Sequence, residues 1–384
     1  MNKLAVKLPP FSPDYSGVCS ALFEVGGMMV IHDASGCTGN YTGYDEPRWY
    51  DSKSFVYCSA LREIDAVMGN DSKFIEKIAN AAVELNPAFI CMLGSPVPMV
   101  IGSDLEGIAL EIESLTGIPA FGFQTTGLRY YDRGVSDAFL AVSKRFVTNA
   151  HKKRPHTVNL LGATPIDFAA GSNIKDFRRE FQARGLEVLS VFAMDCSLEQ
   201  IKESSAATVN VVISASGLPL AQHFYKTFNT PYVIGQPIGK KNSDKLCQLV
   251  ERAGRTGQKL ANIIPEKQDA HILFIGEQVT MHSLRACLYE DFDMIGANLG
   301  CLFNSIPDIT ASSDISLASE KAISNAVNSG GYTHLVADPL LQQLCKKTMH
   351  FTPLPHVAVS SKIHWNKPPE LAGEKINTIL KGIM

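Results

Sequence analysis

"HTVNLLGAT" (residues 156–164), followed by "NIKDFRREFQARG" (residues 173–185), gives the clearest indication of the architecture. The first segment is a short apolar run that ends near a glycine, as a buried strand does. In the second, Ile174, Phe177 and Phe181 recur at the spacing of one helical face. A buried strand followed by an amphipathic helix predicts one unit of a parallel sheet that is covered by helices.

The same alternation recurs over most of the chain. Strands are expected within residues 208–216 and 231–239, and a second set begins with "HILFIGEQ" at residues 271–278. Upstream, strands are expected at 66–69, 88–94 and 120–125, and the last strand is expected at 356–361. The fold class is therefore predicted as α/β, with three consecutive Rossmann-like domains whose parallel sheets surround a central cleft.

Polar, proline-bearing segments suggest where these domains meet. One lies near residue 151 and the other spans residues 262–270. We predict a first domain at 1–152, a second Rossmann-like domain at 153–266, and a third at 267–384 that ends in a C-terminal helix. Ligands of such sheets bind outside the carboxyl ends of the strands, so a cleft between the domains is the expected binding site.

Composition excludes several classes of function. The 384 residues carry a net charge of -3, without a basic stripe, so nucleic-acid binding is not expected. No apolar run approaches the ~18 residues of a membrane span, and prolines interrupt the N-terminus, so we expect a cytoplasmic protein without a membrane partner. The nine cysteines show no disulfide framework and are expected to be reduced.

The common nucleotide and metal motifs are absent from the sequence. Neither G-x-G-x-x-G nor G-x-x-x-x-G-K-[ST] occurs, which predicts that this chain binds no nucleotide. There is also no C-x-x-C, H-E-x-x-H or G-x-S-x-G. The remaining chemical signal is Cys19 and Cys37, which are eighteen residues apart and lie beside small residues. Both are candidate iron-sulfur ligands, and burial as small core residues is the alternative.

Three longer segments carry a resemblance to a known family: "SGVCSALFEVGGMMVIHDASGC" (16–37), "SALREIDAVMGNDSKFIEKI" (59–78) and "VIGSDLEGIALEIE" (100–113). They resemble the component 1 family of nitrogenases, which includes scaffolds for cofactor assembly and tetrapyrrole-reducing enzymes. The resemblance implies a homodimer, or a dimer with a paralogous subunit, and a 4Fe-4S cluster near the interface. It further implies that an ATP-hydrolysing iron-sulfur reductase supplies electrons for a small-molecule or tetrapyrrole substrate in the cleft.

The resemblance also suggests which residues hold the cluster. Cys19 and Cys37 fall where the family places its first two cluster cysteines, and Gly36 would let the backbone approach it. The third family cysteine is replaced at about Pro96. One alternative is that Cys58, or less favourably Cys91, takes its place. The other is that each chain of a homodimer supplies two cysteines, which makes four in all.

Further polar residues near Cys37 are expected to have supporting roles. Ser35 and Gly39 are candidates for backbone support. Asp33 and Asp45 are candidates for an oxygen ligand or a proton donor, although such residues are more often turn-formers. A weaker signal is the turn at Gly276, whose N–H groups are a candidate site for an anionic substrate group.

A second departure concerns the large metal cofactor of true nitrogenases. Its cysteine is replaced by Ile213 or Ser214, and His350 and His356 are the candidates for its histidine, with packing the favoured role of both. Dinitrogen is therefore not the expected substrate. Two other functions remain open, a scaffold for metallocluster assembly that turns over nothing and a non-redox module that binds small molecules.

Overall fold

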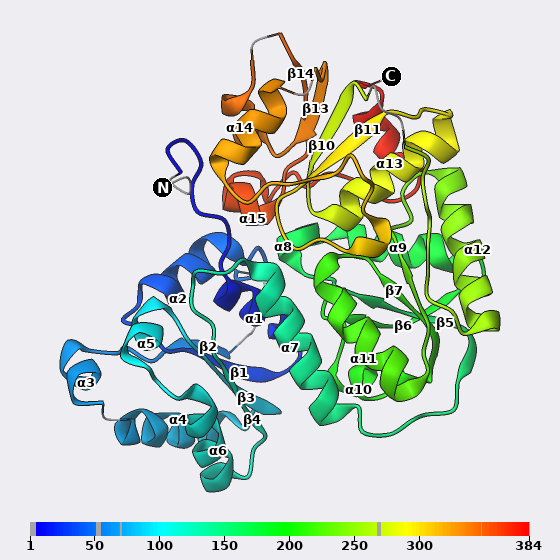
Figure 1. Cartoon of the computed structure of the whole chain (residues 1–384). Helices are drawn as coiled ribbons and strands as arrows, with labels where there is room; N and C mark the ends of the chain where they lie inside the picture. The colour runs from blue at the N-terminus through cyan, green and yellow to red at the C-terminus, as the bar shows by residue number, and fades with distance from the viewer. Residues whose placement is uncertain are drawn as a thin grey trace.

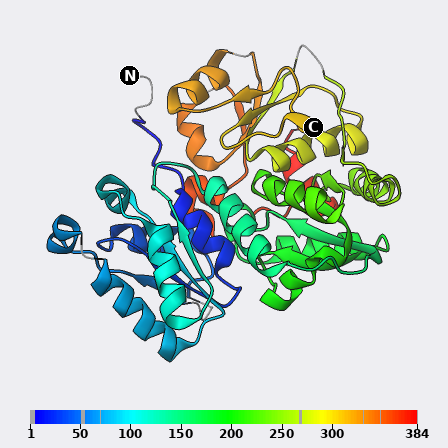
Figure 2. The same cartoon turned by 60° about the horizontal axis from the view of Figure 1, so that its bottom comes forward.

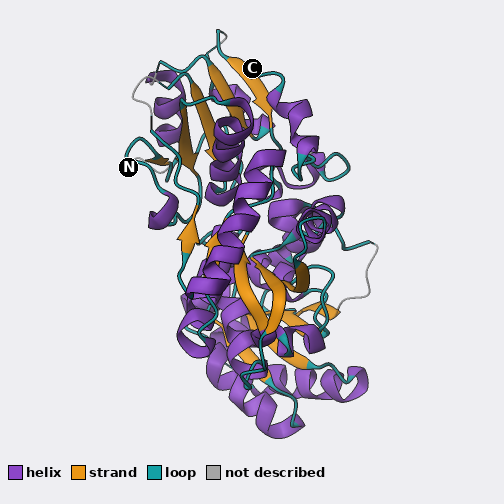
Figure 3. Cartoon of the chain, turned by 90° about the vertical axis from the view of Figure 1, so that its right-hand side faces the viewer, coloured by secondary structure: helices purple, strands orange, loops and turns teal. Residues whose placement is uncertain are grey.

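The computed structural model describes residues 5–50, 55–69, 71–266, 270–329, 331–346 and 348–383. Its elements form three lobes, and the third lobe lies above the other two in Figure 1. Each lobe contains one sheet in which all paired strands are parallel, and helices flank the sheets (Figure 3). The predicted α/β class with three Rossmann-like units is confirmed.

The first sheet has the order β2-β1-β3-β4. Its strands are β1 (Gly27–Ile31), β2 (Phe55–Cys58), β3 (Phe89–Leu93) and β4 (Ala120–Phe123). Its helices are α1 (Asp14–Leu22), α2 (Gly36–Asn40), the π-helical turn η1 (Tyr41–Asp45), α3 (Glu63–Met68), α4 (Ser72–Leu85), α5 (Pro96–Ile101), α6 (Leu105–Thr116) and α7 (Tyr131–Phe146). All residues of β1 and β3 are buried, as expected of central parallel strands. The strand order reverses between β1 and β3, which makes their carboxyl ends the expected binding edge.

The second sheet has the order β6-β5-β7-β8-β9. Its strands are β5 (Arg154–Leu161), β6 (Glu187–Phe192), β7 (Ala207–Val212), β8 (Tyr232–Ile234) and β9 (Leu260–Ala261). Its helices are α8 (Pro165–Phe168), α9 (Ser172–Gln182), α10 (Leu198–Lys202), α11 (Leu218–Phe228) and α12 (Lys240–Thr256), with short 3-10 turns η2 (Ser204–Ala206) and η3 (Ala215–Gly217). The strand and helix expected within 156–185 are β5 and α9, and the apolar side chains Ile174, Phe177 and Phe181 of α9 are buried.

The third sheet has the order β12-β11-β10-β13-β14. Its strands are β10 (Ile272–Gly276), β11 (Ala297–Cys301), β12 (Ile315–Ser316), β13 (His334–Ala337) and β14 (His350–Pro353). Its helices are α13 (Gln278–Phe292), α14 (Glu320–Ser329), α15 (Val357–Ser360) and α16 (Asn377–Leu380). The 3-10 turns are η4 (Pro307–Ile309), η5 (Pro339–Leu344), η6 (Ser361–His364) and η7 (Glu374–Ile376).

Two predicted strands are wrong. Residues 66–69 belong to the end of α3, which has acidic residues in its first turn and ends at Gly69 in the left-handed conformation. Residues 356–361 contain α15, because the imidazole of His356 accepts the Ala358 N–H and caps the helix. Both segments are short apolar runs whose period does not distinguish a strand from a helix.

The three lobes are tied together by segments that cross between them. Helices α1 and α7 pack side by side in the centre (Figure 2), where a Cβ on Gly17 would lie 2.0 Å from the Tyr131 carbonyl oxygen. The N-terminal segment runs along the third lobe, and Ser12 donates its N–H to the Ala358 carbonyl at 2.9 Å. Glu320 accepts three N–H groups of the same segment.

The segment near the C-terminus returns to the second lobe. The amide of Asn173 bonds to Pro369 and Leu371, and Gly373 exchanges backbone hydrogen bonds with Pro237 and Gly239. The strands of the three sheets fall within the predicted domains 1–152, 153–266 and 267–384. Residues 369–373, however, belong to the predicted third domain and bond to the second lobe. The domain limits remain a prediction, and part of the joint at 262–270 lies outside the described residues. Within the described part of the chain, no helix is long and apolar enough to cross a membrane.

Candidate functional site

Asp33 organises the loop that follows β1. One oxygen of its carboxylate accepts the backbone N–H groups of Ser35 at 2.9 Å and Cys37 at 2.8 Å. These bonds satisfy the first amides of α2, which otherwise have no partner at a helix N-terminus. Ser35 has a φ of 152°, an uncommon value for a residue with a side chain, and the Asp33 bonds hold it there. Asp33 is therefore a cap for the Cys37 loop.

The same residue also holds Cys58, at the end of β2. The Cys58 thiol donates to the Asp33 carbonyl oxygen at 3.3 Å, and the Ala60 N–H points at the Cys58 sulfur at 3.3 Å. Register explains the proximity, because Cys58 pairs with Ile31 at the carboxyl end of β1. Cys37 and Cys58 are both half-buried. The structure thus places these two cysteines at one edge of the first sheet.

Hydroxyl groups from two other elements reach the Cys37 thiol. The Tyr15 phenol from α1 and the Ser95 hydroxyl before α5 are its side-chain hydrogen-bond partners. Burial raises the pKa of the Cys37 thiol, and the bonds from Tyr15 and Ser95 act in the opposite direction. Ser95 is fully buried and also bonds to the His32 carbonyl at 3.0 Å. Cys37 is therefore a protonated thiol with two adjacent hydroxyl groups at neutral pH.

Cys19 and Cys91 lie elsewhere, within the core. Cys19 belongs to α1, where every residue is buried, and Cys91 is in the middle of β3. Each thiol is fully buried, and burial raises the pKa of both well above the ordinary value. Glu46 is a charged neighbour of Cys19, and Glu46 is itself held by Arg48 at 2.7 Å. Both cysteines fill the space between α1 and the sheet.

No three His, Cys, Asp or Glu side chains converge on one point in a way that holds a metal ion, as far as the described residues go. Asp33 contacts both Cys37 and Cys58, whereas Cys19 and Cys91 lie fully buried in the core. Pro96, at the position of the missing family cysteine, is the first residue of α5 and follows Ser95. The other cysteines are Cys196, Cys247, Cys287 and Cys301, all buried, and Cys345, half-buried.

Gly36 and Gly39 face open space. A Cβ built on either glycine would meet no atom within 4 Å. Neither residue has a positive φ, so nothing within the described chain requires glycine there. A requirement for glycine at these positions would therefore come from a group outside this chain that approaches the Cys37 loop.

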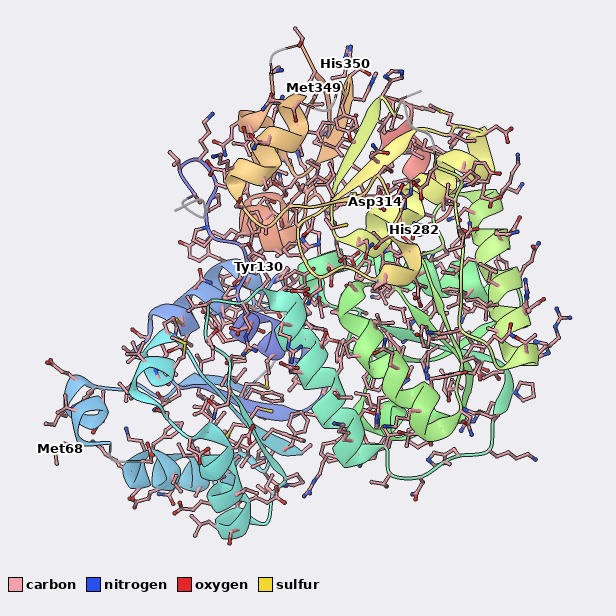
Figure 4. The ribbon with its side chains drawn as sticks, in the orientation of Figure 1. Met68, Tyr130, His282, Asp314, Met349 and His350 are labelled. Carbon is pink, nitrogen blue, oxygen red and sulfur yellow. The ribbon has the colours of Figure 1, made fainter. Side chains whose placement is uncertain are left out.

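A second polar cluster lies where the three lobes meet, the region marked by Tyr130 in Figure 4. Tyr131 donates its hydroxyl to Asp167 of α8, and the His356 ring nitrogen Nε2 is 3.4 Å from the same carboxylate. Burial and the neighbouring Asp167 raise the pKa of Glu277 to about 7. The cavity among Asp167, His356 and their neighbours has a volume of about 20 Å³, which is room for one water molecule.

The remaining predicted residues fall into separate places. Ile213 and Ser214 are fully buried at the end of β7. His350 lies on the edge strand β14 and stacks on His334, far from Tyr130 in Figure 4. The turn at Gly276 offers no free anion site, since the Glu277 carboxylate already accepts the N–H groups of Ala215 and Thr280. His356 alone of the two histidines reaches the junction.

Asp45 and Tyr15 complete the surroundings of Cys37. The Asp45 carboxylate is buried and accepts Ser12 at 2.8 Å, Ser16 at 2.7 Å and Asn40 at 3.0 Å. Burial raises the pKa of Asp45 to about 6. The sequence did not indicate Tyr15, because nothing in the spacing of α1 marks its phenol as a partner of Cys37. A serine two residues after a buried strand was a usable signal for Ser95.

The sequence matches the family described as nitrogenase component 1 type oxidoreductase over residues 13–295, which is more than half of the chain. The chain belongs to this family. A nitrogenase molybdenum-iron protein alpha chain of Methanothermobacter thermautotrophicus is 25% identical over 54% of this chain and 47% of its own length. A nitrogenase iron-molybdenum cofactor biosynthesis protein NifE of Clostridium pasteurianum is 24% identical over 53% of this chain and 45% of its own. One subunit of the light-independent protochlorophyllide reductase of Pyropia yezoensis is 22% identical over 59% and 45%, respectively.

These component 1 relatives are matched over about half of their length or less. The fold extends further than the sequence similarity. The solved structure of nitrogenase Cp1 at pH 6.5 superimposes with a TM-score of 0.73, covering 100% of this chain and 93% of that chain at 13% identity. The component 1 fold therefore includes all three lobes.

Proposed function

We propose that this chain is a component 1 type oxidoreductase subunit that holds a 4Fe-4S cluster, accepts electrons from an ATP-hydrolysing iron-sulfur reductase, and reduces a small molecule other than dinitrogen. Membership of the component 1 family supports the reaction class. The observation that carries the proposal is the pair Cys37 and Cys58, which Asp33 holds at one open edge of the first sheet. Iron-sulfur clusters need several thiolates that converge on one face.

Two thiols per chain fit a cluster shared by two copies of the chain. Both sulfurs are half-buried, and the space in front of Gly36 is open to a second molecule. A two-fold dimer, or a dimer with a paralogous subunit that supplies its own pair, then provides four thiolates. Cys19 is also a ligand that the family resemblance favours, but it is fully buried within α1. We therefore propose Cys37 and Cys58 as the first pair to test, with Cys19 and Cys91 as the alternatives.

The residues around Cys37 would tune such a site. A bound 4Fe-4S cluster supplies one-electron transfer at low potential. Cys37 must release its proton to become a ligand, so metal binding is opposed at low pH. The Tyr15 hydroxyl can keep donating to the sulfur, and hydrogen bonds to a ligating sulfur raise the reduction potential.

The packing at the junction leaves no room for a large metal cofactor of the kind that dinitrogen reduction would need. The rings of Tyr131, Phe303 and His356 contact one another there, and the cavity holds about 20 Å³. Neither Ile213 nor Ser214 supplies a thiolate. The same packing disfavours the scaffold function, because a precursor metallocluster would need these side chains to move apart.

Iron and acid-labile sulfide analysis after anaerobic purification tests the proposal. We expect Cys37→Ser and Cys58→Ser to lose most of the iron, and Cys345→Ser, a half-buried thiol of the third lobe, to keep it. Cys19→Ser and Cys91→Ser test the alternative ligands, with circular dichroism to verify folding. Reduction of the iron-loaded protein by an iron-protein reductase and ATP then tests electron entry. Iron-free wild-type protein, or iron content independent of Cys37, would contradict the proposal.

A further inference from the structure

A larger cavity lies between the first and third lobes, next to the Cys37 loop. Its volume is about 560 Å³, within the range typical of small-molecule sites. Its walls come from the N-terminal segment, from η1 and from residues 358–363. Hydrogen bonds hold these walls together, since Ser12 bonds to Ala358 and the Ser361 hydroxyl donates to the Tyr44 carbonyl at 2.6 Å. The cavity is therefore formed without a ligand.

Most of the lining is apolar or aromatic. Pro9, Phe11 and Pro13 contribute from the N-terminal segment, and Tyr44 and Ile363 face them from η1 and η6. Tyr44 and Ile363 are exposed although both are large apolar side chains. Proline and aromatic rings present flat apolar surfaces, which favour a ligand that itself contains a ring system.

One cation stands at this cavity without an acidic partner. The Lys362 ammonium lies 4.8 Å from the centre of the Tyr44 ring, and it forms no ion pair with any carboxylate in the described part of the chain. Asp45 is the carboxyl group of the lining, and its oxygens already accept three side-chain donors. Lys362 is thus available to an anionic group of a ligand. A single lysine in an apolar wall suits an organic anion better than inorganic phosphate, which needs several donors.

The cavity is one side chain away from the Cys37 sulfur. Tyr15 lines the cavity, and its phenol is a hydrogen-bond partner of both Cys37 and Asn40. A molecule seated against Tyr15 would therefore lie one side chain from Cys37. This relationship connects the cavity to the proposed redox site.

We infer that this cavity binds the substrate, and that the substrate is a ring-bearing organic anion whose charged group pairs with Lys362. Only the assignment of this anion as the substrate rests on the proposed function, since the binding of such an anion needs no cluster. Phe11, Tyr44 and Ile363 would contact the ring system, and Tyr15 would separate it from Cys37. Binding can therefore be measured on iron-free protein.

Isothermal titration of the iron-free protein with 2-naphthoate tests the inference. Lys362→Gln should weaken 2-naphthoate binding by about fivefold, the effect of losing one exposed charge interaction. The neutral analogue 2-naphthalenemethanol should bind both proteins equally. The matched control is Lys367→Gln, an exposed lysine outside the cavity, which should bind 2-naphthoate as the wild type does.

A second variant covers the apolar wall. Ile363→Glu puts a carboxylate beside Lys362 and should abolish 2-naphthoate binding, while circular dichroism and the melting temperature stay near those of the wild type. Coproporphyrin, a macrocyclic polycarboxylate, is titrated alongside, and either a compact or a macrocyclic anion that depends on both Lys362 and Ile363 supports the inference. Equal effects of Lys362→Gln and Lys367→Gln, or binding unaffected by Ile363→Glu, would overturn it. Wild-type protein that contains no iron but still binds 2-naphthoate would contradict the proposed cluster and leave the inferred anion site intact.

Discussion

The carboxylate of Asp33 accepts the backbone N–H of Cys37 at 2.8 Å, while its carbonyl oxygen accepts the thiol of Cys58 at 3.3 Å. One residue just after β1 therefore contacts both cysteines. The position of Cys37 depends on a helix cap, so capping and iron binding would be coupled in the proposed site.

Asp33→Ala should lower both stability and iron content. Loss of a capping carboxylate costs about 1 kcal/mol in the free energy of unfolding, and here it also frees the Cys37 loop. Asp104→Ala is the matched control, because Asp104 caps α6 by accepting the Gly107 N–H at 2.9 Å. Urea unfolding should give similar losses of stability for the two variants, whereas iron should fall only in Asp33→Ala. Equal iron content in the two variants would show that the Asp33 cap does not affect iron binding.

Gly36→Ala should impair iron binding without destabilising the iron-free protein. A Cβ at this position meets open space in α2, and alanine favours a helix over glycine by up to about 1 kcal/mol. Gly17→Ala is the contrasting variant, since its Cβ would lie 2.0 Å from the Tyr131 carbonyl oxygen and should cost about 1–3 kcal/mol. Thermal unfolding of iron-free protein and iron analysis measure the two effects. An iron content at the wild-type level in Gly36→Ala would mean that nothing approaches this glycine.

Alkylation should reveal the raised pKa of Cys37. Because burial raises this pKa, less thiolate is present at pH 8 than in an ordinary thiol, and the iodoacetamide rate should keep rising with pH above 9. The Tyr15 hydrogen bond lowers the pKa, so Tyr15→Phe should shift the rate profile of Cys37 to higher pH. Mass spectrometry of the Cys37 peptide between pH 7 and 10 measures the rate. The Cys345 peptide of the same protein serves as an internal standard, and a profile of Cys37 that is unchanged in Tyr15→Phe would contradict the expectation.

His282 should make the third lobe sensitive to acid. Its Nε2–H donates to the Asn262 carbonyl at 2.9 Å, and Arg285, which also donates to Asp314, donates to Nδ1; Figure 4 labels His282 and Asp314. Burial lowers the pKa of His282 to about 4, so the folded state resists a proton that the unfolded chain takes up near pH 6.5. Stability should therefore fall as the pH drops below 6.5, by about 2 kcal/mol between pH 7 and 5.

The variant His282→Gln tests this pH dependence, because glutamine cannot titrate. Urea unfolding at pH 7 and 5 should show a smaller loss of stability on acidification in His282→Gln than in the wild type. His350→Gln, a substitution of an exposed histidine on β14, should keep the wild-type difference. An identical loss in the wild type and both variants would assign the acid sensitivity to other groups.

Much of the fold follows from the sequence because buried parallel strands leave continuous apolar runs. The runs at 88–94 and 156–164 became β3 and β5. The run at 66–69 was wrongly predicted as a buried strand. It belongs to α3, which has acidic residues in its first turn and ends at Gly69, and its apolar side chains are exposed. Periodicity alone does not report which face of a short segment is covered.

The candidate site was predictable only in part. The polar, glycine-rich loop singled out Cys37, whereas Cys58 was a candidate only as a substitute for the family's third cysteine, and the strand β2 that carries it was not predicted. The family resemblance favoured Cys19, whose apolar neighbours on α1 mark a core position just as well. Contacts between Tyr15 and Cys37, or between Lys362 and Tyr44, join segments that the sequence does not relate.

The return of residues 369–375 to the second lobe has a thermodynamic consequence. The third sheet is connected to the second lobe both at its beginning, through the chain, and after its last strand, through the bonds of Asn173 and Gly373. Neither lobe can unfold while the other keeps all of these contacts. Heating should therefore melt the two later lobes in a single cooperative transition, and the first lobe, whose core is continuous with theirs and whose N-terminal segment bonds to the third lobe, should melt with them.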